Sequence, residues 1–236
     1  MEEVSAMKVR VKFSKHGVMK FIGHLDIMRY FQKAIRRAEI PICFTEGFSP
    51  HMIMSFASPL GVGLTSDGEY MDIEVKESIP SKEAVERLNR VMVEGMKVIS
   101  YRQIPDGKAS NAMSLVAYAD YTVTFREGKE PAPDWRERLA DFAAQPSLMI
   151  TKKTKKSEKE VDIRPMIHEL CLLENGGIFM RLSSGSASNL KPELVMEAFI
   201  SYLGEASEPF ALLVNRMELY DEHMVSLEEL GEDIGE

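Results

Sequence analysis

Two histidines and one aspartate are the side chains of this chain best suited to proton transfer. His24 and Asp26 stand at the expected start of a helix, and His51 lies in a loop rich in Gly and Pro. If the fold brought them together, an imidazole beside a positioned carboxylate could act as a general acid or base, for instance on a ribose hydroxyl. Their spacing matches no zinc or nucleophile motif. Hydrogen bonds that cap the helix and hold the loop are the simpler alternative.

The loop that contains His51 belongs to residues 40–66, the stretch around which the chain is organised. Gly and Pro recur through this stretch, and their density predicts tight turns. Polar side chains on such turns are candidates for a binding pocket, and here they are Glu46, Ser49, His51 and Ser55. The alternative is a pair of turns on either side of one buried strand.

A row of basic residues is expected on the exposed side of the helix that begins near His24. The row consists of Arg29, Lys33, Arg36 and Arg37. Because only Glu39 lies close by, these cations would stay largely unpaired and could contact RNA phosphates. A solvated helix face is the alternative.

A second group of cations is expected at the tip of a β-hairpin. Its members are Lys152, Lys153, Lys155, Lys156, Lys159 and Arg164. Glu158 and Glu160 relieve only part of this charge. Together with the basic helix, the hairpin indicates structured RNA, such as tRNA or rRNA, as a partner. Lysines that only keep the protein soluble are the alternative.

Several common classes of site have no signature in this sequence. It contains no P-loop and no Gly-x-Gly-x-x-Gly motif. The carboxylates are scattered, without the spacing of a glycosidase or two-metal site, and Cys43 and Cys171 form no Cys-x-x-Cys pair. We therefore expect no metal and no cofactor. The cysteines are expected to be small buried hydrophobes in a reducing compartment.

The net charge of −8 is concentrated at one end of the chain. Residues 218–236 contain eight acids and no Lys or Arg, so the preceding residues sum to zero. We expect an acidic, solvated tail over residues 221–236. No apolar run approaches the ~20 residues that span a bilayer, and the acids near the N-terminus are unlike a secretory signal. A cytoplasmic protein without a membrane partner is predicted.

Residues 7–13 show the alternation of a half-buried strand. Its apolar residues Val9, Val11 and Phe13 share one face. Its basic residues are expected on the solvent face, and they are Lys8, Arg10 and Lys12.

Hydrophobic periodicity along the chain predicts an α+β fold. The first half is expected to contain strands at 7–13, 52–57, 69–76 and 96–104 and helices at 24–39 and 81–92. Their order, β-α-β-β-α-β, is the ferredoxin-like pattern. Beyond a linker at 106–110 the order recurs with one extra strand, and long strands are expected at 115–125 and 160–173. We therefore predict tandem ferredoxin-like halves with antiparallel sheets, at 1–105 and 111–220, followed by the acidic tail.

Three short elements of the sequence resemble those of a known family. They are His-Leu-Asp at 24–26, Gly-Phe-Ser-Pro-His at 47–51 and Pro-Leu-Gly-Val-Gly at 59–63. In this order they resemble the signature of uncharacterised radical-SAM-associated proteins, in which a domain of unknown function follows a radical-SAM domain or stands alone. The resemblance covers most of residues 7–76 and adds Glu69 and Tyr70 to the pocket candidates.

The resemblance implies a bacterial-type accessory module that serves a radical-SAM enzyme. The chain itself has no Cys-x-x-x-Cys-x-x-Cys motif for an iron–sulfur cluster. Our leading hypothesis is a non-catalytic protein that binds structured RNA and presents it to such a partner. One alternative is an RNA-processing or RNA-modifying enzyme that uses His24, Asp26 and His51. Another is a protein adaptor that docks a partner on the apolar segment 52–64 without RNA.

Overall fold

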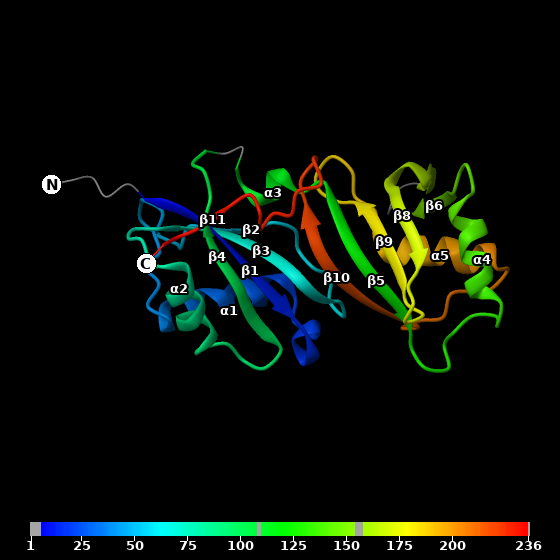
Figure 1. Ribbon diagram of the computed structural model, residues 1–236, viewed down its shortest axis with the longest axis horizontal. Helices are drawn as coiled ribbons and strands as arrows, with labels where there is room; N and C mark the ends of the chain where they lie inside the picture. Colours follow the sequence, from blue (N-terminus) through cyan, green and yellow to red (C-terminus); the bar gives the residue numbers. More distant parts are fainter. Residues whose placement is uncertain (1–5, 108–109, 154–157, 236) are drawn as a thin grey trace. The chain divides into compact units, whose positions relative to one another are not determined.

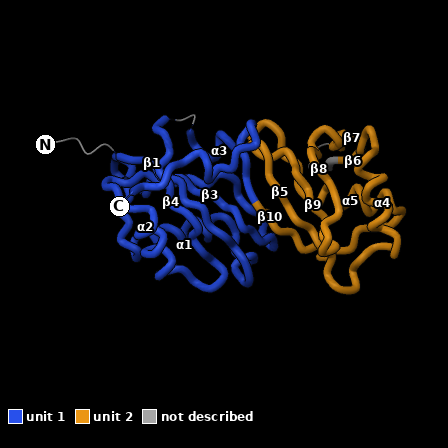
Figure 2. The backbone as a smooth tube through the Cα atoms, viewed as in Figure 1, with its two compact units in different colours: residues 1–116, 218–236 blue, residues 117–217 orange. Residues whose placement is uncertain are grey.

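A computed structural model describes residues 6–107, 110–153 and 158–235. The fold is mixed α+β with mostly antiparallel strand pairing, as the periodicity predicts. The chain divides into two compact units, one of residues 1–116 with 218–236 and the other of residues 117–217 (Figure 2). The C-terminal residues therefore belong to the same unit as the N-terminal ones. None of the helices in the described part of the chain has the length and apolar character needed to cross a membrane.

The first unit consists of antiparallel strands and their helices (Figure 1). Its elements are β1 (Met7–Lys15), η1 (Gly17–Phe21), α1 (His24–Arg37), β2 (Met54–Phe56), β3 (Thr65–Val75), α2 (Ser81–Asn89), β4 (Met96–Gln103), α3 (Ala112–Leu115) and β11 (Glu232–Asp233). The strand order is β11-β4-β1-β3, and β2 also pairs with β3. The predicted strands and helices of the first half are therefore present, although β2 is shorter than expected.

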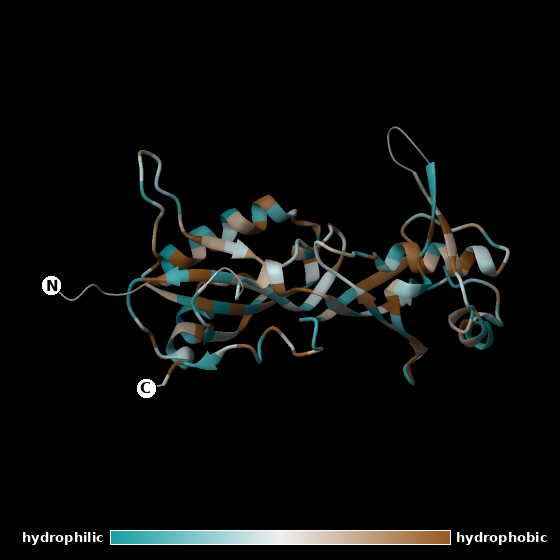
Figure 3. Ribbon diagram, turned by 90° about the horizontal axis from the view of Figure 1, so that it is seen from above, coloured by the Kyte–Doolittle hydropathy of each residue, from teal (hydrophilic) through white to brown (hydrophobic). Residues whose placement is uncertain are grey.

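The core of the first unit lies between the sheet and the apolar sides of α1 and α2. These helices carry apolar and polar residues on different sides, which is visible as alternating colour along the helical ribbons of Figure 3. The buried residues that the strands and helices contribute include Val9, Val11, Phe13, Ile27, Phe31, Ile35, Met71, Ile73, Ala84 and Leu88. The predicted buried face of β1 is thus confirmed.

The second unit has a sheet with the strand order β10-β5-β9-β8 and a separate hairpin, β6–β7. Its elements are β5 (Tyr118–Phe125), α4 (Trp135–Ala143), β6 (Met149–Lys153), β7 (Glu158–Asp162), η2 (Arg164–Met166), β8 (Ile167–Leu172), β9 (Ile178–Ser183), α5 (Pro192–Tyr202) and β10 (Leu212–Tyr220), whose last three residues count with the first unit. Trp135 is buried, and its ring centroid lies 5.2 Å from that of Phe125 and 6.4 Å from that of Phe199.

Two strand predictions in the second half of the chain were wrong in their extent. The strand expected at 160–173 is divided into β7 and β8 by η2, which contains Pro165. Proline has no N–H to donate to a strand ladder and its fixed φ suits a helical turn, so the strand breaks there. The strand expected from residue 115 begins at Tyr118, because α3 occupies Ala112–Leu115.

The outer face of β1 is not the solvated basic surface that its alternation predicts. Arg10 is only 1% exposed. Its Nε and Nη2 donate to the two carboxylate oxygens of Asp72, at 2.8 and 3.0 Å. Nη1 donates to the backbone carbonyl of Leu227, and Nη2 also donates to that of Ser110. This arginine is therefore a buried structural group and is not available to a ligand.

The acidic C-terminal residues pack on this face, and the prediction of a solvated tail was wrong. The Lys12 ammonium lies 2.7 Å from a carboxylate oxygen of Glu218 and 2.7 Å from one of Glu228. Burial alone would lower the pKa of Lys12, but the hydrogen bonds and charges of the two carboxylates outweigh it and raise that pKa. Further along, β11 pairs with β4. Glu218 and Glu228 are thus the counter-charges of Lys12 on β1.

Candidate functional site

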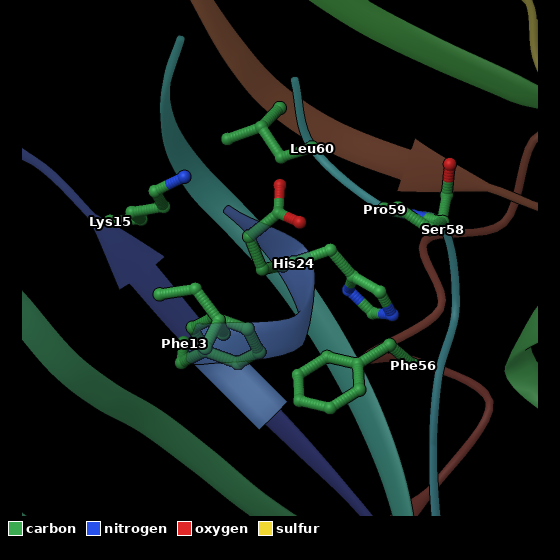
Figure 4. A pocket seen from close by; sticks show the side chains of 9 residues that line it. Phe13, Lys15, His24, Phe56, Ser58, Pro59 and Leu60 are labelled. Carbon is green, nitrogen blue, oxygen red and sulfur yellow. The ribbon is translucent and has the colours of Figure 1, made fainter. Parts of the chain in front are cut away.

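A small cavity in the first unit brings three titratable side chains of different types together. It lies beside the N-terminus of α1, and its lining includes Lys15, His24 and Glu69 (Figure 4). Apolar side chains form the rest of the wall, among them Phe56 and Leu60. About 20 Å³ inside it is open to water, which is room for one water molecule. The cavity therefore suits a water or a single small group and is too small for a whole nucleobase.

His24 reaches this cavity because α1 begins at that residue. Gly23 precedes it in an extended conformation, and the backbone N–H groups of Asp26 and Ile27 donate to the Gly23 carbonyl. The imidazole packs against Phe56, with the two ring centroids 5.3 Å apart at near-perpendicular orientation. Figure 4 shows this ring pair at one side of the cavity. The packing holds the imidazole in one orientation beside the cavity.

Lys15 is the residue of this cavity that the sequence interpretation missed. It is 2% exposed, and its ammonium donates to the Ile22 carbonyl at 3.1 Å. Figure 4 shows Lys15 and the His24 ring on different sides of the cavity that both residues line. The burial of Lys15 could have been predicted from the sequence. Lys15 follows Phe13 by two residues and so belongs to the apolar side of β1. A lysine on the buried face of a strand is unusual and is a reason to look for a site.

Glu69 enters the cavity from the neighbouring strand. On β3 it is paired with Phe13 of β1, and it is 5% exposed. The resemblance placed Glu69 and Tyr70 together in one pocket, but successive strand residues point to opposite faces. Tyr70 lies on the other face, where its hydroxyl donates to Glu218 at 2.5 Å. Burial and the Glu218 charge raise the pKa of Tyr70, so it stays neutral.

The other pocket candidates do not line this cavity. Glu46, Ser49 and His51 lie in the exposed loop 45–51, which is closed by the Phe44–Met52 bridge. A ring nitrogen of His51 is hydrogen-bonded to the Ser49 carbonyl at 2.9 Å. Ser55 lies on β2 opposite Asp72.

The predicted catalytic group is not assembled as a unit. Asp26 is exposed and forms an ion pair with Arg29 at 3.1 Å. Neither Asp26 nor His51 lines the cavity that contains His24. His24 is therefore accompanied in this cavity by Lys15 and Glu69.

The basic row of α1 lies on the exposed side of the helix. All four cations, Arg29, Lys33, Arg36 and Arg37, are exposed. Arg29 pairs with Asp26, and among the described residues no carboxylate lies within ion-pair distance of Lys33, Arg36 or Arg37. The opposite side of the helix is anchored by Phe31 and Ile35, which are buried. The helix therefore presents three cations that have no carboxylate partner in the part of this unit that the structure describes.

The second cationic group is only partly covered by the structure. Lys155 and Lys156 lie outside the described residues, and for Lys152 and Lys153 only the backbone of β6 is described. Arg164 follows the hairpin in η2 and is half-buried, and its guanidinium donates to the Ile167 carbonyl at 2.7 Å. This arginine has a structural role in the second unit. The proposed interface therefore rests on α1.

Part of the apolar segment 52–64, considered as an adaptor surface, belongs to the core. Met52, Phe56, Ala57 and Leu60 are buried, while Val62 is exposed. The four buried side chains are therefore not open to a protein partner.

Comparison with known proteins gives a family without an assigned activity. Residues 8–192 match a family described as an uncharacterized protein conserved in bacteria, DUF2344. No curated protein matches the chain. The family description says nothing about a radical-SAM partner, so that part of the resemblance stays a prediction.

Proposed function

The chain belongs to the DUF2344 family of uncharacterized proteins conserved in bacteria, and we propose that it is an accessory protein that binds structured RNA through α1. The observation that carries the proposal is the set of three exposed cations, Lys33, Arg36 and Arg37, without a carboxylate partner among the described residues. Unneutralised cations on a rigid helix favour a polyanion, because each phosphate contact releases counterions.

The geometry of α1 suits a phosphate backbone. From Arg29 to Arg37 the helix rises about 12 Å at 1.5 Å per residue, so the row is long enough for several contacts. Arg36 and Arg37 also lie in the last turn, where cations stabilise a helix. Stabilisation of the last turn does not require cations further back along the helix. The exposed row, however, extends back to Arg29, and this extent is what favours RNA.

The strand orders support the proposed ferredoxin-like architecture, on which RNA binding is common. In the first unit, β2 next to β3 extends the order to β4-β1-β3-β2. In the second unit the order β10-β5-β9-β8 has the same form, with α4 after the first strand and α5 after the third. Both correspond to the 4-1-3-2 order of a split βαβ unit. We infer that each unit is ferredoxin-like.

The resemblance adds a finer proposal, that the bound RNA is presented to a radical-SAM enzyme. It predicts a complex between this protein and such an enzyme from the same bacterium. Size-exclusion chromatography with light scattering, with and without tRNA, tests it. If the radical-SAM enzyme elutes separately from this protein under both conditions, presentation to that enzyme is contradicted, while the proposal of RNA binding is not.

The RNA proposal predicts tight and salt-sensitive binding of total tRNA or rRNA fragments. With three or four phosphate contacts, raising the salt from about 50 to 200 mM should weaken binding about 20- to 150-fold. Fluorescence anisotropy with labelled RNA at both salt concentrations measures this change. If no binding is detected at the lower concentration, the proposal is wrong.

The cavity favours a second candidate function, an enzyme acting on RNA. A base there that removes the proton of a ribose 2′-hydroxyl would allow that oxygen to attack the adjacent phosphorus. The 5′-oxygen then leaves with a proton from an acid, which gives a 2′,3′-cyclic phosphate and a 5′-hydroxyl. His24 and Lys15, together with the carboxylate of Glu69, supply groups of the required types in one place.

Substitution of the two histidines separates this candidate from simple binding. We expect His24→Gln to keep RNA affinity within about twofold but to lose cleavage by about 10²- to 10⁴-fold, the range for general acid–base groups. His51→Gln is the matched control, because His51 lies outside the cavity. Electrophoresis of labelled RNA after incubation detects the products. An intact RNA with the wild-type protein would rule out this activity on the RNA tested.

A further inference from the structure

An exposed apolar patch adjoins the N-terminal end of the basic row. It consists of Val18, Phe21, Leu25 and Val62, all more than half exposed. Two contacts join the segments that carry it. The backbone N–H of Gly63 donates to the Lys20 carbonyl at 2.7 Å, and a side-chain atom of Val62 lies next to Gly23. The patch therefore spans η1, the first turn of α1 and the loop after β2.

This patch is continuous with the cations of α1. Leu25, Arg29 and Lys33 follow each other at intervals of four residues and so share one side of the helix. All three are exposed. Along this helix side the surface therefore changes from the apolar Leu25 to Arg29, which is paired with Asp26, and then to Lys33.

A lysine ammonium also lies over the ring of Phe21. The Lys20 ammonium lies 5.2 Å from the centroid of the Phe21 ring, and the ring is 61% exposed. An exposed aromatic ring beside an ammonium matches both parts of a nucleotide, since the base can stack on the ring while the phosphate meets the charge.

We infer that Phe21 stacks on an unpaired base of the RNA whose backbone is bound by α1. The inference rests on the proposed function and specifies its substrate class, an RNA with a single-stranded segment next to the contacted phosphates. Duplex RNA keeps its bases stacked on each other, so it offers no free base to this ring. An apolar protein surface would instead have to cover the Lys20 ammonium at the margin of the patch, which makes an anionic ligand the better match.

The inference predicts that Phe21→Ala selectively weakens binding of single-stranded RNA. With an unstructured RNA of about 12 nucleotides, affinity should fall about 5- to 150-fold, the worth of one base–aromatic stack. A blunt-ended duplex of the same sequence should bind the variant and the wild type within about twofold. Phe48→Ala is the matched control, because Phe48 is fully exposed in the loop 45–51 of the same unit, and it should leave both affinities unchanged.

Three outcomes separate this inference from the function on which it rests. If Phe21→Ala binds single-stranded RNA like the wild type while Arg36→Glu/Arg37→Glu does not, stacking is overturned and RNA binding by α1 stands. If the wild type binds neither RNA, both proposals are overturned. If light scattering shows a wild-type dimer that Phe21→Ala dissociates, the patch belongs to a second copy of the chain and the inference is wrong.

Discussion

We expect Asp72→Ala to lower the free energy of unfolding by about 3–5 kcal/mol, the range for removing one partner of a buried ion pair. The substitution leaves the Arg10 guanidinium buried without its counter-charge, at 1% exposure. It also removes the acceptor of the Ala112 backbone N–H, which lies 2.6 Å from an Asp72 oxygen. Urea denaturation followed by circular dichroism measures the loss.

Two further variants show whether this loss comes from the buried charge. Asp106→Ala removes an exposed aspartate of the same unit, and it should change stability by less than about 0.5 kcal/mol. Arg10→Met/Asp72→Leu removes both charges and should recover much of the loss, because no unpaired ion remains. If Asp72→Ala lowers the free energy of unfolding by less than about 1 kcal/mol, the Arg10–Asp72 pair does not stabilise the outer face of β1 as we expect.

We expect Lys12→Met to cost about 2–4 kcal/mol near pH 7, since the substitution leaves two poorly solvated carboxylates facing each other. In the native protein, burial alone would raise the pKa of Glu228, but the hydrogen bond and charge of Lys12 outweigh it and lower that pKa. This contribution to stability is present above the ordinary pKa of 4.5 and is lost as the pH falls through the lowered value.

The pH dependence of Lys12→Met should have the opposite sign. Without the cation, repulsion from Glu218 raises the pKa of Glu228, so the folded variant binds a proton more readily than the unfolded chain. The variant should therefore gain stability between about pH 7 and 5, where the wild type does not. Lys97→Met, on the exposed face of β4, is the control. Parallel pH profiles for Lys12→Met and the wild type would contradict the assigned role of this cluster.

Local periodicity was sufficient to predict β1, α1, β2, β3, α2 and β4 of the first unit. The apolar face of β1 and the buried side of α1 follow from alternation and from helical spacing. Lys15 could have been recognised by the same rule, because it continues the apolar face of β1. The exposure of Arg29, Lys33, Arg36 and Arg37 was predicted for the same reason, since the opposite side of the helix is apolar.

Pairing between distant segments could not be predicted from such patterns. Lys12 and Glu218 are 206 residues apart in the chain. At both positions the local sequence pattern is that of an ordinary exposed charged residue. The acidic segment was therefore expected to be solvated, although the carboxylates of Glu218 and Glu228 pair with Lys12 of β1. The loop candidates failed for a related reason, since turn residues reveal that a loop is exposed but not which cavity it approaches.

The most direct test of the account compares two charge-reversal variants in RNA binding. Arg36→Glu/Arg37→Glu reverses the proposed interface, and Lys82→Glu/Arg90→Glu reverses two exposed cations, one in α2 and one at its C-cap, with the same change in net charge. We predict that the first variant binds tRNA about tenfold or more weakly, with a salt dependence reduced by about 1 to 2 in log–log slope. The second should bind like the wild type. Equal weakening in both variants, or none in the first, would contradict RNA binding by α1.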